Sequence, residues 1–204
     1  MQKNRIDGKG ITRLLAVLAA VLVVLVGLNL LLDRLNKKEP KKNVRQKVEL
    51  YEPDYTCNIF EDPEYMDEEN FIMYTENDQS TRIYNSAEAE AAGQLGTFFF
   101  NFIKDMIYGN YKNFNGYFTD GYLERYGRFG RFTMQRLYNI DVQIVSKEAN
   151  GDGTFSDLCK LVFSIMKNDG TVFDFVPSDS SKPMYLTVVE DAGGTSAKID
   201  ELDY

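Results

Sequence analysis

The chain has 204 residues, with 23 Lys or Arg, 31 Asp or Glu and a formal net charge of −8. This acidic balance argues against general nucleic-acid binding, which relies on clustered cationic side chains that displace counterions from phosphates. The sequence contains no His, which excludes Ser-His-Asp and Cys-His catalytic centres and His-ligated zinc sites. Cys57 and Cys159 are too few and too far apart for a disulfide scaffold or a thiolate metal site. We therefore expect no metal and no cofactor.

A long apolar run near the N-terminus predicts a membrane span. Residues 14–32, between Arg13 and Asp33, carry Asn29 as their only polar side chain. At about 1.5 Å per residue this run covers roughly 28 Å, close to the ~30 Å hydrocarbon core of a bilayer. Residues 33–38, which follow, contain no small-x-small cleavage site, and this argues against a signal peptide. The sequence thus predicts a short basic tail over 1–10 and an uncleaved transmembrane helix over 11–32.

The orientation of this single-pass chain in the cell membrane is governed by competing signals. More Lys and Arg follow the apolar run than precede it, and this count favours a cytoplasmic C-terminal side. However, large domains cross membranes largely regardless of charge, and a short basic tail before a first helix commonly stays inside. We therefore predict that residues 40–204 are extracytoplasmic, with the opposite orientation as the alternative.

Residues 33–84 have the composition of a charged tether. The first part, 33–48, is rich in Lys and Arg, whereas Glu49 to Asp78 contains eleven acidic residues and no basic one. Pro53 and Pro63 interrupt any regular element, and apolar periodicity is lacking. We predict a solvated tether, first basic and then acidic. The alternative is a segment whose interleaved aromatic residues dock on the domain or on a partner; no Asp-x-Asp spacing supports calcium binding.

Helical periodicity begins at Asn85, which opens a capping-box pattern closed by Glu88. Gly109 is well placed to end the helix. Shorter helices are predicted over 111–118, over 119–126 with Thr119 as N-cap, and over one or two turns within 132–138. The apolar positions of the long helix follow at helical spacing: Leu95, Phe98, Phe99, Phe102, Ile103, Met106 and Ile107. This stripe predicts that the helix packs on a sheet or on another helix.

After Asn139 the apolar period changes to two. Ile140, Val142 and Ile144 alternate with polar residues, and a second run places Cys159 and its alternate neighbours on one face. Further strands are predicted over 171–176, 184–190 and 197–204, separated by Gly-, Asn- and Asp-rich turns. Helices followed by an antiparallel meander indicate an α+β fold, with one domain over 85–204.

This order of elements resembles the NTF2-like superfamily. The resemblance rests on the long amphipathic helix and on the closing strand over 197–202, and on a Gly- and aromatic-rich stretch between them: Gly109-Asn110-Tyr111, Phe114, Phe118 and Thr119-Asp120-Gly121-Tyr122. It covers about residues 86–204 and implies a curved antiparallel sheet wrapped round the helix as a cone. Membrane-anchored members of the superfamily include scaffold proteins of conjugation channels, whose anchor-plus-domain layout is similar.

The resemblance leaves the activity open, because one fold hosts enzymes, ligand binders and assembly modules. We expect a non-enzymatic domain for assembly or ligand binding in a bacterial cell-envelope complex, with the bilayer and a protein partner or a second copy as partners. The alternatives are a small-ligand receptor using the cone as a pocket and an enzyme with Tyr/Asp acid–base chemistry. Superfamily enzymes of the scytalone-dehydratase type depend on His, and the strand acids Asp141 and Asp174 are predicted to face outward.

One cluster of residues is a candidate site for a partner or an anion. Its four arginines are Arg125, Arg128, Arg131 and Arg136, interleaved with Tyr126, Phe129 and Phe132. Planar guanidinium groups beside aromatic rings suit an acidic peptide, a carboxylate or a phosphate. The alternative is a flexible loop whose arginines are solvated or paired with the acidic tether.

Overall fold

The computed structural model describes residues 49–191, 193 and 195–204, which belong to one compact unit. The predicted transmembrane helix over 11–32 and the basic part of the tether over 33–48 lie outside the described residues. Within the described part, no helix combines the length and the hydropathy that a bilayer crossing requires.

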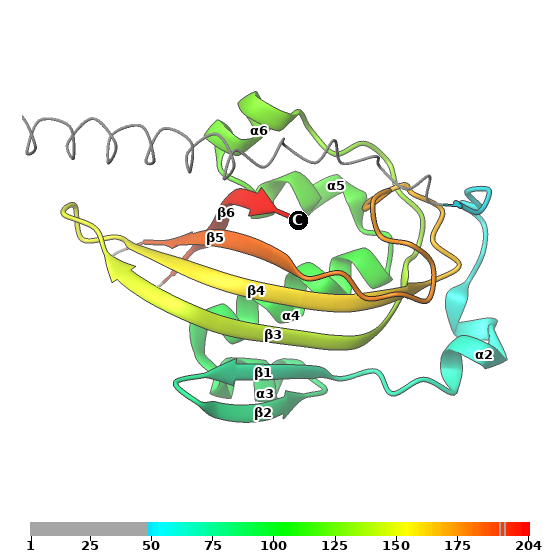
Figure 1. The fold of residues 1–204 in the computed structure, drawn as a ribbon, viewed down its shortest axis with the longest axis horizontal. Coiled ribbons are helices and arrows are strands. Elements are labelled where there is room, and N and C mark those ends of the chain that lie inside the picture. Colours follow the sequence, from blue (N-terminus) through cyan, green and yellow to red (C-terminus); the bar gives the residue numbers. More distant parts are fainter. Residues whose placement is uncertain (1–48, 192, 194) are drawn as a thin grey trace, which may run out of the picture. The chain divides into compact units, whose positions relative to one another are not determined.

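A curved, six-stranded sheet forms the frame of the domain (Figure 1). Its spatial order is β2-β1-β3-β4-β5-β6, and all neighbours are antiparallel except β1 and β3, which run parallel. The strands are β1 (Ile72–Glu76), β2 (Gln79–Ile83), β3 (Arg136–Ala149), β4 (Phe155–Met166), β5 (Met184–Glu190) and β6 (Ala197–Asp203). The α+β class and the predicted strands over 184–190 and 197–204 are confirmed, the last to Asp203.

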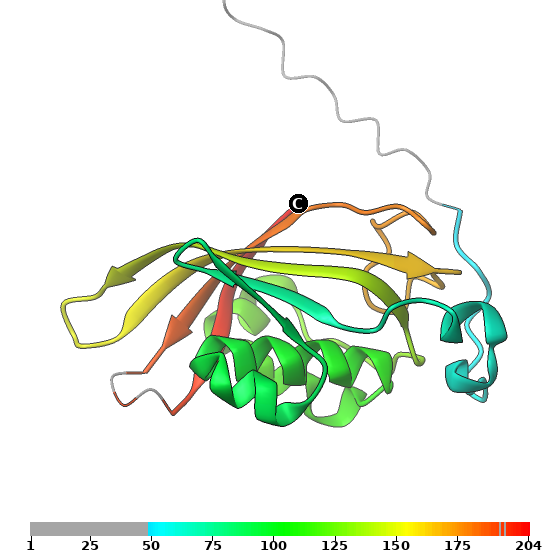
Figure 2. The same ribbon diagram turned by 90° about the horizontal axis from the view of Figure 1, so that it is seen from below.

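The helices gather on one face of this sheet, as Figure 2 shows. They are α3 (Ser86–Ala91), α4 (Gly93–Ile107), α5 (Tyr111–Phe114), the 3-10 turn η2 (Asn115–Tyr117) and α6 (Asp120–Tyr126). The predicted caps are confirmed: Asn85 Oδ1 accepts the Glu88 amide at 3.1 Å, and Thr119 Oγ1 accepts the Tyr122 amide at 3.0 Å. The long predicted helix is divided at Gly93, whose φ of 88° belongs to the left-handed region.

The apolar stripe of α4 forms the centre of the core. Phe99, Phe102 and Met106 expose none of their surface, and the ring of Phe102 stacks on Phe114 of α5 with centroids 5.2 Å apart. Phe118 meets Phe102 edge to face at 6.1 Å. The space between α4, α5 and the sheet is therefore filled by aromatic side chains.

The predicted tether is wrong over its described part, residues 49–84. This segment forms the 3-10 turn η1 (Ile59–Glu61), the short helix α2 (Pro63–Met66) and the hairpin β1–β2. Ile72 and Tyr74 alternate inward along β1, and the hairpin turns at Asn77 and Asp78, which both have positive φ. The acidic side chains hide this pattern in the sequence because most of them face solvent, while only a few residues between them, Ile59, Tyr65, Ile72 and Tyr74, are buried.

Two further expectations fail in the loops that flank β3 and β4. Residues 132–135 are not helical, and the strand β3 begins at Arg136. Residues 171–175 form turns instead of a strand, because the buried Asn168 amide donates to the carbonyl oxygens of Phe173 at 2.8 Å and Val176 at 2.7 Å. The Asn168 side chain thus supplies hydrogen bonds to backbone carbonyl groups that would bond to a neighbouring strand if residues 171–176 formed a strand.

Replacing the most enclosed ring of α4 tests this packing. We expect Phe102→Ala to lower the free energy of unfolding of residues 49–204 by about 3–5 kcal/mol, because the cavity would lie among Phe98, Phe114 and Phe118. Chemical denaturation measures the loss. The control Tyr185→Ala removes a ring that is 43% exposed and should change stability by less than about 0.5 kcal/mol. A loss below about 1 kcal/mol for Phe102→Ala would contradict the packing of α4.

Candidate functional site

The four predicted arginines do not converge on one site. Arg125 of α6 lies beside β6, where its Nη2 is 3.6 Å from Asp200 Oδ2, and Arg128 is exposed in the loop that follows α6. Phe129, next to it, stacks on Phe118 with centroids 4.8 Å apart. The Gly-Arg-Phe repeat therefore places its phenylalanines inward and its arginines outward, which is a packing pattern.

The other two arginines contact the acidic segment that was predicted to be a tether. The guanidinium of Arg131 lies 4.3 Å from the ring centroid of Tyr55, and Arg136 Nε donates to Asp62 Oδ2 at 3.0 Å. Arg136 Nη2 also lies 3.2 Å from Cys57 Sγ. Arg136 is thus paired with the acidic segment, as the alternative interpretation predicted, whereas Arg131 contacts an aromatic ring of that segment.

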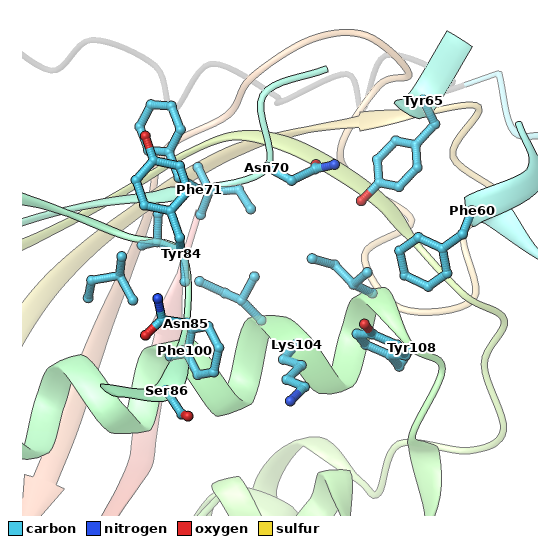
Figure 3. Close-up of a pocket in the computed structure, with 15 residues that line it drawn as sticks. Phe60, Tyr65, Asn70, Phe71, Tyr84, Asn85, Ser86, Phe100, Lys104 and Tyr108 are labelled. Atoms are coloured by element: carbon cyan, nitrogen blue, oxygen red, sulfur yellow. The ribbon is translucent and has the colours of Figure 1, made fainter. Parts of the chain in front are cut away.

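A groove on the other side of this segment is the strongest candidate site (Figure 3). It encloses about 360 Å³ between residues 58–71 on one wall and α4 with residues 83–86 on the other. We call it the aromatic groove, because six of its lining residues carry aromatic rings: Phe60, Tyr65, Phe71, Tyr84, Phe100 and Tyr108.

Helix α4 supplies the floor of the aromatic groove. Phe100, Lys104 and Tyr108 follow one another at intervals of four residues, so they share one face of the helix and of its C-cap. Lys104 Nζ lies 5.6 Å from the ring centroid of Phe100 and 5.9 Å from that of Tyr108. Lys104 is exposed, and its amine lies between these two rings at the rim of the groove and points away from the opposite wall (Figure 3).

Residues 58–71 supply the opposite wall through contacts between rings. Phe60 lies 5.1 Å from Tyr108, centroid to centroid, and Phe71 lies 5.4 Å from Tyr84. Tyr65 is fully buried, and its hydroxyl donates to the Leu137 carbonyl at 3.1 Å. Burial raises the pKa of Tyr65 to about 12, so this hydroxyl stays protonated and keeps donating across the physiological range.

The mouth of the groove exposes much aromatic surface. Tyr84 is 54% exposed, Tyr108 is 49% exposed and Phe60 is 36% exposed. Clustered exposed rings of this kind are typical of binding surfaces, since tyrosine combines a large apolar area with a polar tip. The sequence analysis missed this site, although the spacing of Phe100, Lys104 and Tyr108 was a signal for it.

A second group of polar residues lies near the end of β4 remote from the groove. Asp157 exposes no surface and Glu190 of β5 is nearly buried, and both approach Lys147 of β3, whose Nζ is 3.7 Å from Asp157 Oδ1. These are not the acids named from the sequence, because Asp174 is exposed and Asp141 is half-buried. Asp157 is two residues before Cys159 and lies on the same face of β4. The alternation of side chains along the strand was therefore sufficient to predict that it points inward.

One amine cannot neutralise both carboxylates of this group. Neither side-chain oxygen of Asp157 has a hydrogen-bond partner among the described residues. Burial, together with the neighbouring Glu190, raises the pKa of Asp157 to about 7, while Lys147 opposes the shift. Nearby, the Tyr74 hydroxyl donates to Glu76 Oε2 at 2.9 Å. Because Asp157 is fully enclosed, a substrate could not reach it. We interpret Asp157 and Glu190 as a structural pair of carboxyl groups that shares a proton.

Within residues 49–191, 193 and 195–204, no group of three or more acidic or thiol side chains is arranged to hold a metal ion. The comparisons with known proteins add no family to this picture: no protein-family model, no curated protein and no solved structure matches the chain.

The buried carboxyl should make stability depend on pH. The pKa of Asp157 rises from 3.8 to about 7 on folding. Between these pH values the carboxyl group is protonated in the folded state and ionised in the unfolded state. Stability then falls as pH rises, by up to about 1.4 kcal/mol per pH unit, and the cost is complete above the folded pKa. We expect Asp157→Asn to flatten this dependence.

Urea denaturation of wild type and variant at several values between about pH 5 and 8 measures the effect, with Asp174→Asn as an exposed control. Parallel curves for wild type and Asp157→Asn would contradict the account of this carboxyl.

Proposed function

We propose that this chain is a membrane-anchored, non-enzymatic binding module of a bacterial cell-envelope complex, in which the aromatic groove holds an apolar segment of a partner protein. The observation that carries the proposal is the groove itself, with three exposed rings round its mouth and Lys104 at its rim. The extracytoplasmic placement rests on the predicted transmembrane helix over 11–32 and on its short basic tail.

The packing of the domain supports a binding role at the surface. Phenylalanines fill the space between α4 and the sheet, so the groove lies beside the core. A curved sheet with helices on one face is compatible with the NTF2-like superfamily, whose anchored members act as scaffolds. The filled interior favours assembly over a receptor that encloses its ligand within the cone.

The chemistry of the groove specifies what a partner segment would carry. Buried aromatic contacts are the usual centres of binding energy at protein interfaces, at about 2 kcal/mol or more for the best of them. Lys104 adds a donor for a carboxylate at the exposed rim, where an ion pair contributes about 0–1 kcal/mol. The partner segment therefore combines apolar side chains for the rings with an acidic group for Lys104.

A small-molecule receptor is the second candidate. The volume of about 360 Å³ falls within the range of roughly 300–1,000 Å³ that small-molecule sites occupy. An apolar molecule with a carboxylate would use the same rings and the same lysine. The two candidates differ in the size of the ligand. A segment of a partner protein extends out of the groove, whereas a small molecule does not, and crosslinking can tell these cases apart.

Site-specific photo-crosslinking distinguishes these candidates in cells. A photoreactive phenylalanine analogue at Tyr108 should form a discrete protein adduct, and the same analogue at Tyr185, exposed on β5, should not. Adding Phe100→Ala in the groove should reduce the Tyr108 adduct about tenfold, corresponding to about 1.4 kcal/mol of binding. Equal adducts at both positions would refute the assembly proposal, and no protein adduct at Tyr108 would favour the small-molecule receptor.

The topology of the chain is tested separately. Because a short basic tail precedes one long apolar run, alkaline phosphatase fused after Tyr204 should be active, and a cytoplasmic reporter fused at the same point should be inactive. A fusion after residue 10 provides the matched control, with the reverse pattern expected. An inactive phosphatase beside an active cytoplasmic reporter at the C-terminus would place the domain in the cytoplasm.

A further inference from the structure

The two edge strands of the sheet differ in how the rest of the domain covers them. At β6 the Thr119 amide donates to the Ile199 carbonyl at 2.9 Å, and Arg125 Nη2 donates to the Asp200 carbonyl. At the opposite edge, β2 receives no such main-chain hydrogen bond on its outer side from the described residues (Figure 1). The first four residues of β2 are exposed. One edge of the sheet is therefore covered, and the other is open.

The geometry of the hairpin shows which backbone groups of β2 face the open side. The turn between β1 and β2 has two residues, so the residues beside it bond to each other, and bonded pairs then alternate with unbonded ones along the ladder. Gln79 and Thr81 therefore bond to β1, whereas the N–H and C=O groups of Ser80 and Arg82 point away from it. None of these outward groups has a partner within the described part of the chain. They are a template for one more strand.

Strand β2 lacks the features that usually protect an edge. It contains no proline, and its register with β1 is continuous, without a bulge. Its only charged residue is Arg82, whose guanidinium lies 4.7 Å from the ring centroid of Phe71, the residue before β1. This contact draws the charge toward β1 and leaves the open side without it.

A hollow beside β2 supplies space for the side chains of an added strand. It encloses about 410 Å³ between the hairpin and α3. Thr81 lines the hollow from β2, and the small residues Ala91 and Ala92 line it from the end of α3. Opposite residues on neighbouring strands share one face of a sheet. The residue that pairs with Thr81 on an added strand would therefore point into this hollow.

The charge of the hollow determines which side chain fits there. Glu76 and Glu88 are among its lining residues, and none of the lining residues is Lys or Arg. Glu76 Oε2 accepts the Tyr74 hydroxyl and Glu88 Oε2 accepts the Tyr84 amide, so one oxygen of each carboxylate is left for a ligand. A cationic side chain complements these acids. A second copy of β2 would instead bring the same carboxylates with it, and like charges repel.

We propose that the β2 edge binds an extended segment of a partner protein as an additional antiparallel strand, with a Lys or Arg of that segment in the hollow beside α3. Antiparallel pairing is the slightly more stable arrangement. Main-chain bonds to Ser80 and Arg82 supply affinity, and the hollow selects the residue opposite Thr81. The hollow and the aromatic groove share no lining residue, so this surface goes beyond the proposed function.

A synthetic peptide, Thr-Val-Thr-Lys-Thr-Val-Thr with a fluorescent label, is the probe. Its binding to the full chain in lipid nanodiscs is measured by fluorescence anisotropy. The lysine peptide should bind, and the same peptide with glutamate in place of lysine should bind about tenfold more weakly.

Backbone methylation of the peptide tests the added strand without changing the protein. With lysine opposite Thr81, the N–H groups of the two flanking threonines face β2, and the N–H of lysine faces away from it. N-methyl groups on the two threonines should therefore lower the affinity about tenfold, because each removes a main-chain hydrogen bond. An N-methyl group on the lysine is the matched control and should change the affinity less than about twofold.

Substitutions in the chain test the two parts of the surface separately. Ser80→Pro removes an outward N–H and leaves the bonds to β1, so it should weaken binding of the lysine peptide about fivefold. Glu88→Gln removes one charge of the hollow and keeps a side chain suited to the cap of α3, and it should weaken binding about threefold. Glu90→Gln is the control, because Glu90 is exposed on the same helix outside the hollow, and it should bind like wild type.

Several outcomes would overturn the proposal. These are a lysine peptide that does not bind, equal affinities of the lysine and glutamate peptides, and equal affinities of the two kinds of N-methylated peptide. An affinity that falls as the concentration of the chain is raised would assign the edge to a second copy instead. Thermal unfolding checks that Ser80→Pro keeps the fold, and the methylated peptides test the same edge in the unaltered chain.

Discussion

The packing of the α4 phenylalanines against the sheet is the interaction on which the rest of the domain depends. Phe99 and Phe102 are fully buried, and Phe102 is in ring contact with α5 through Phe114. Burial of this face fixes the rotation of the helix about its axis. The same rotation turns Phe100 toward the groove and leaves Lys104 at its rim, so the position of the candidate site follows from the core.

Ion pairs join distant elements at two places in the domain. Residues 49–71, called the strap here, are acidic, and the cations that they meet, Arg136 and Lys167, come from β3 and from the residue that follows β4. At the other end of these strands the balance is reversed, because Lys147 lies between Asp157 and Glu190. In the first arrangement Asp62 and Arg136 are mostly buried and the contact of Lys167 with Glu64 is near solvent. The second arrangement is enclosed and responds to protons.

Most of the regular elements could be predicted from the sequence, because their patterns were local. The apolar stripe of α4 and the alternation along β4 each reflect one buried face. The caps at Asn85 and Thr119 depend on hydrogen bonds between residues three positions apart. The strap and the hairpin β1–β2 could not be recognised in this way. Their apolar residues are few and stand between carboxylates, and only contacts with distant residues such as Met166 decide that they are buried.

The candidate site was hidden for a related reason. The arginines between 125 and 136 formed a conspicuous group in the sequence, yet their common spacing followed from the inward phenylalanines between them. The aromatic groove combines rings from the strap, from residue 84 and from α4, which are far apart along the chain. No window of the sequence contains these residues together, so their meeting was visible only in the fold.

The parallel pairing of β1 with β3 has a consequence for the way the chain folds. Ile72 lies opposite Ile140 and Thr75 opposite Gln143, although more than sixty residues separate them in the sequence. Contacts between such distant residues slow folding, because a long loop must close before any pairing repays its entropy. During synthesis, the hairpin emerges well before the strand that receives it. Its inner edge therefore has no partner in the growing chain until β3 emerges, and β3 then pairs with β1 on one side and with the later strand β4 on the other.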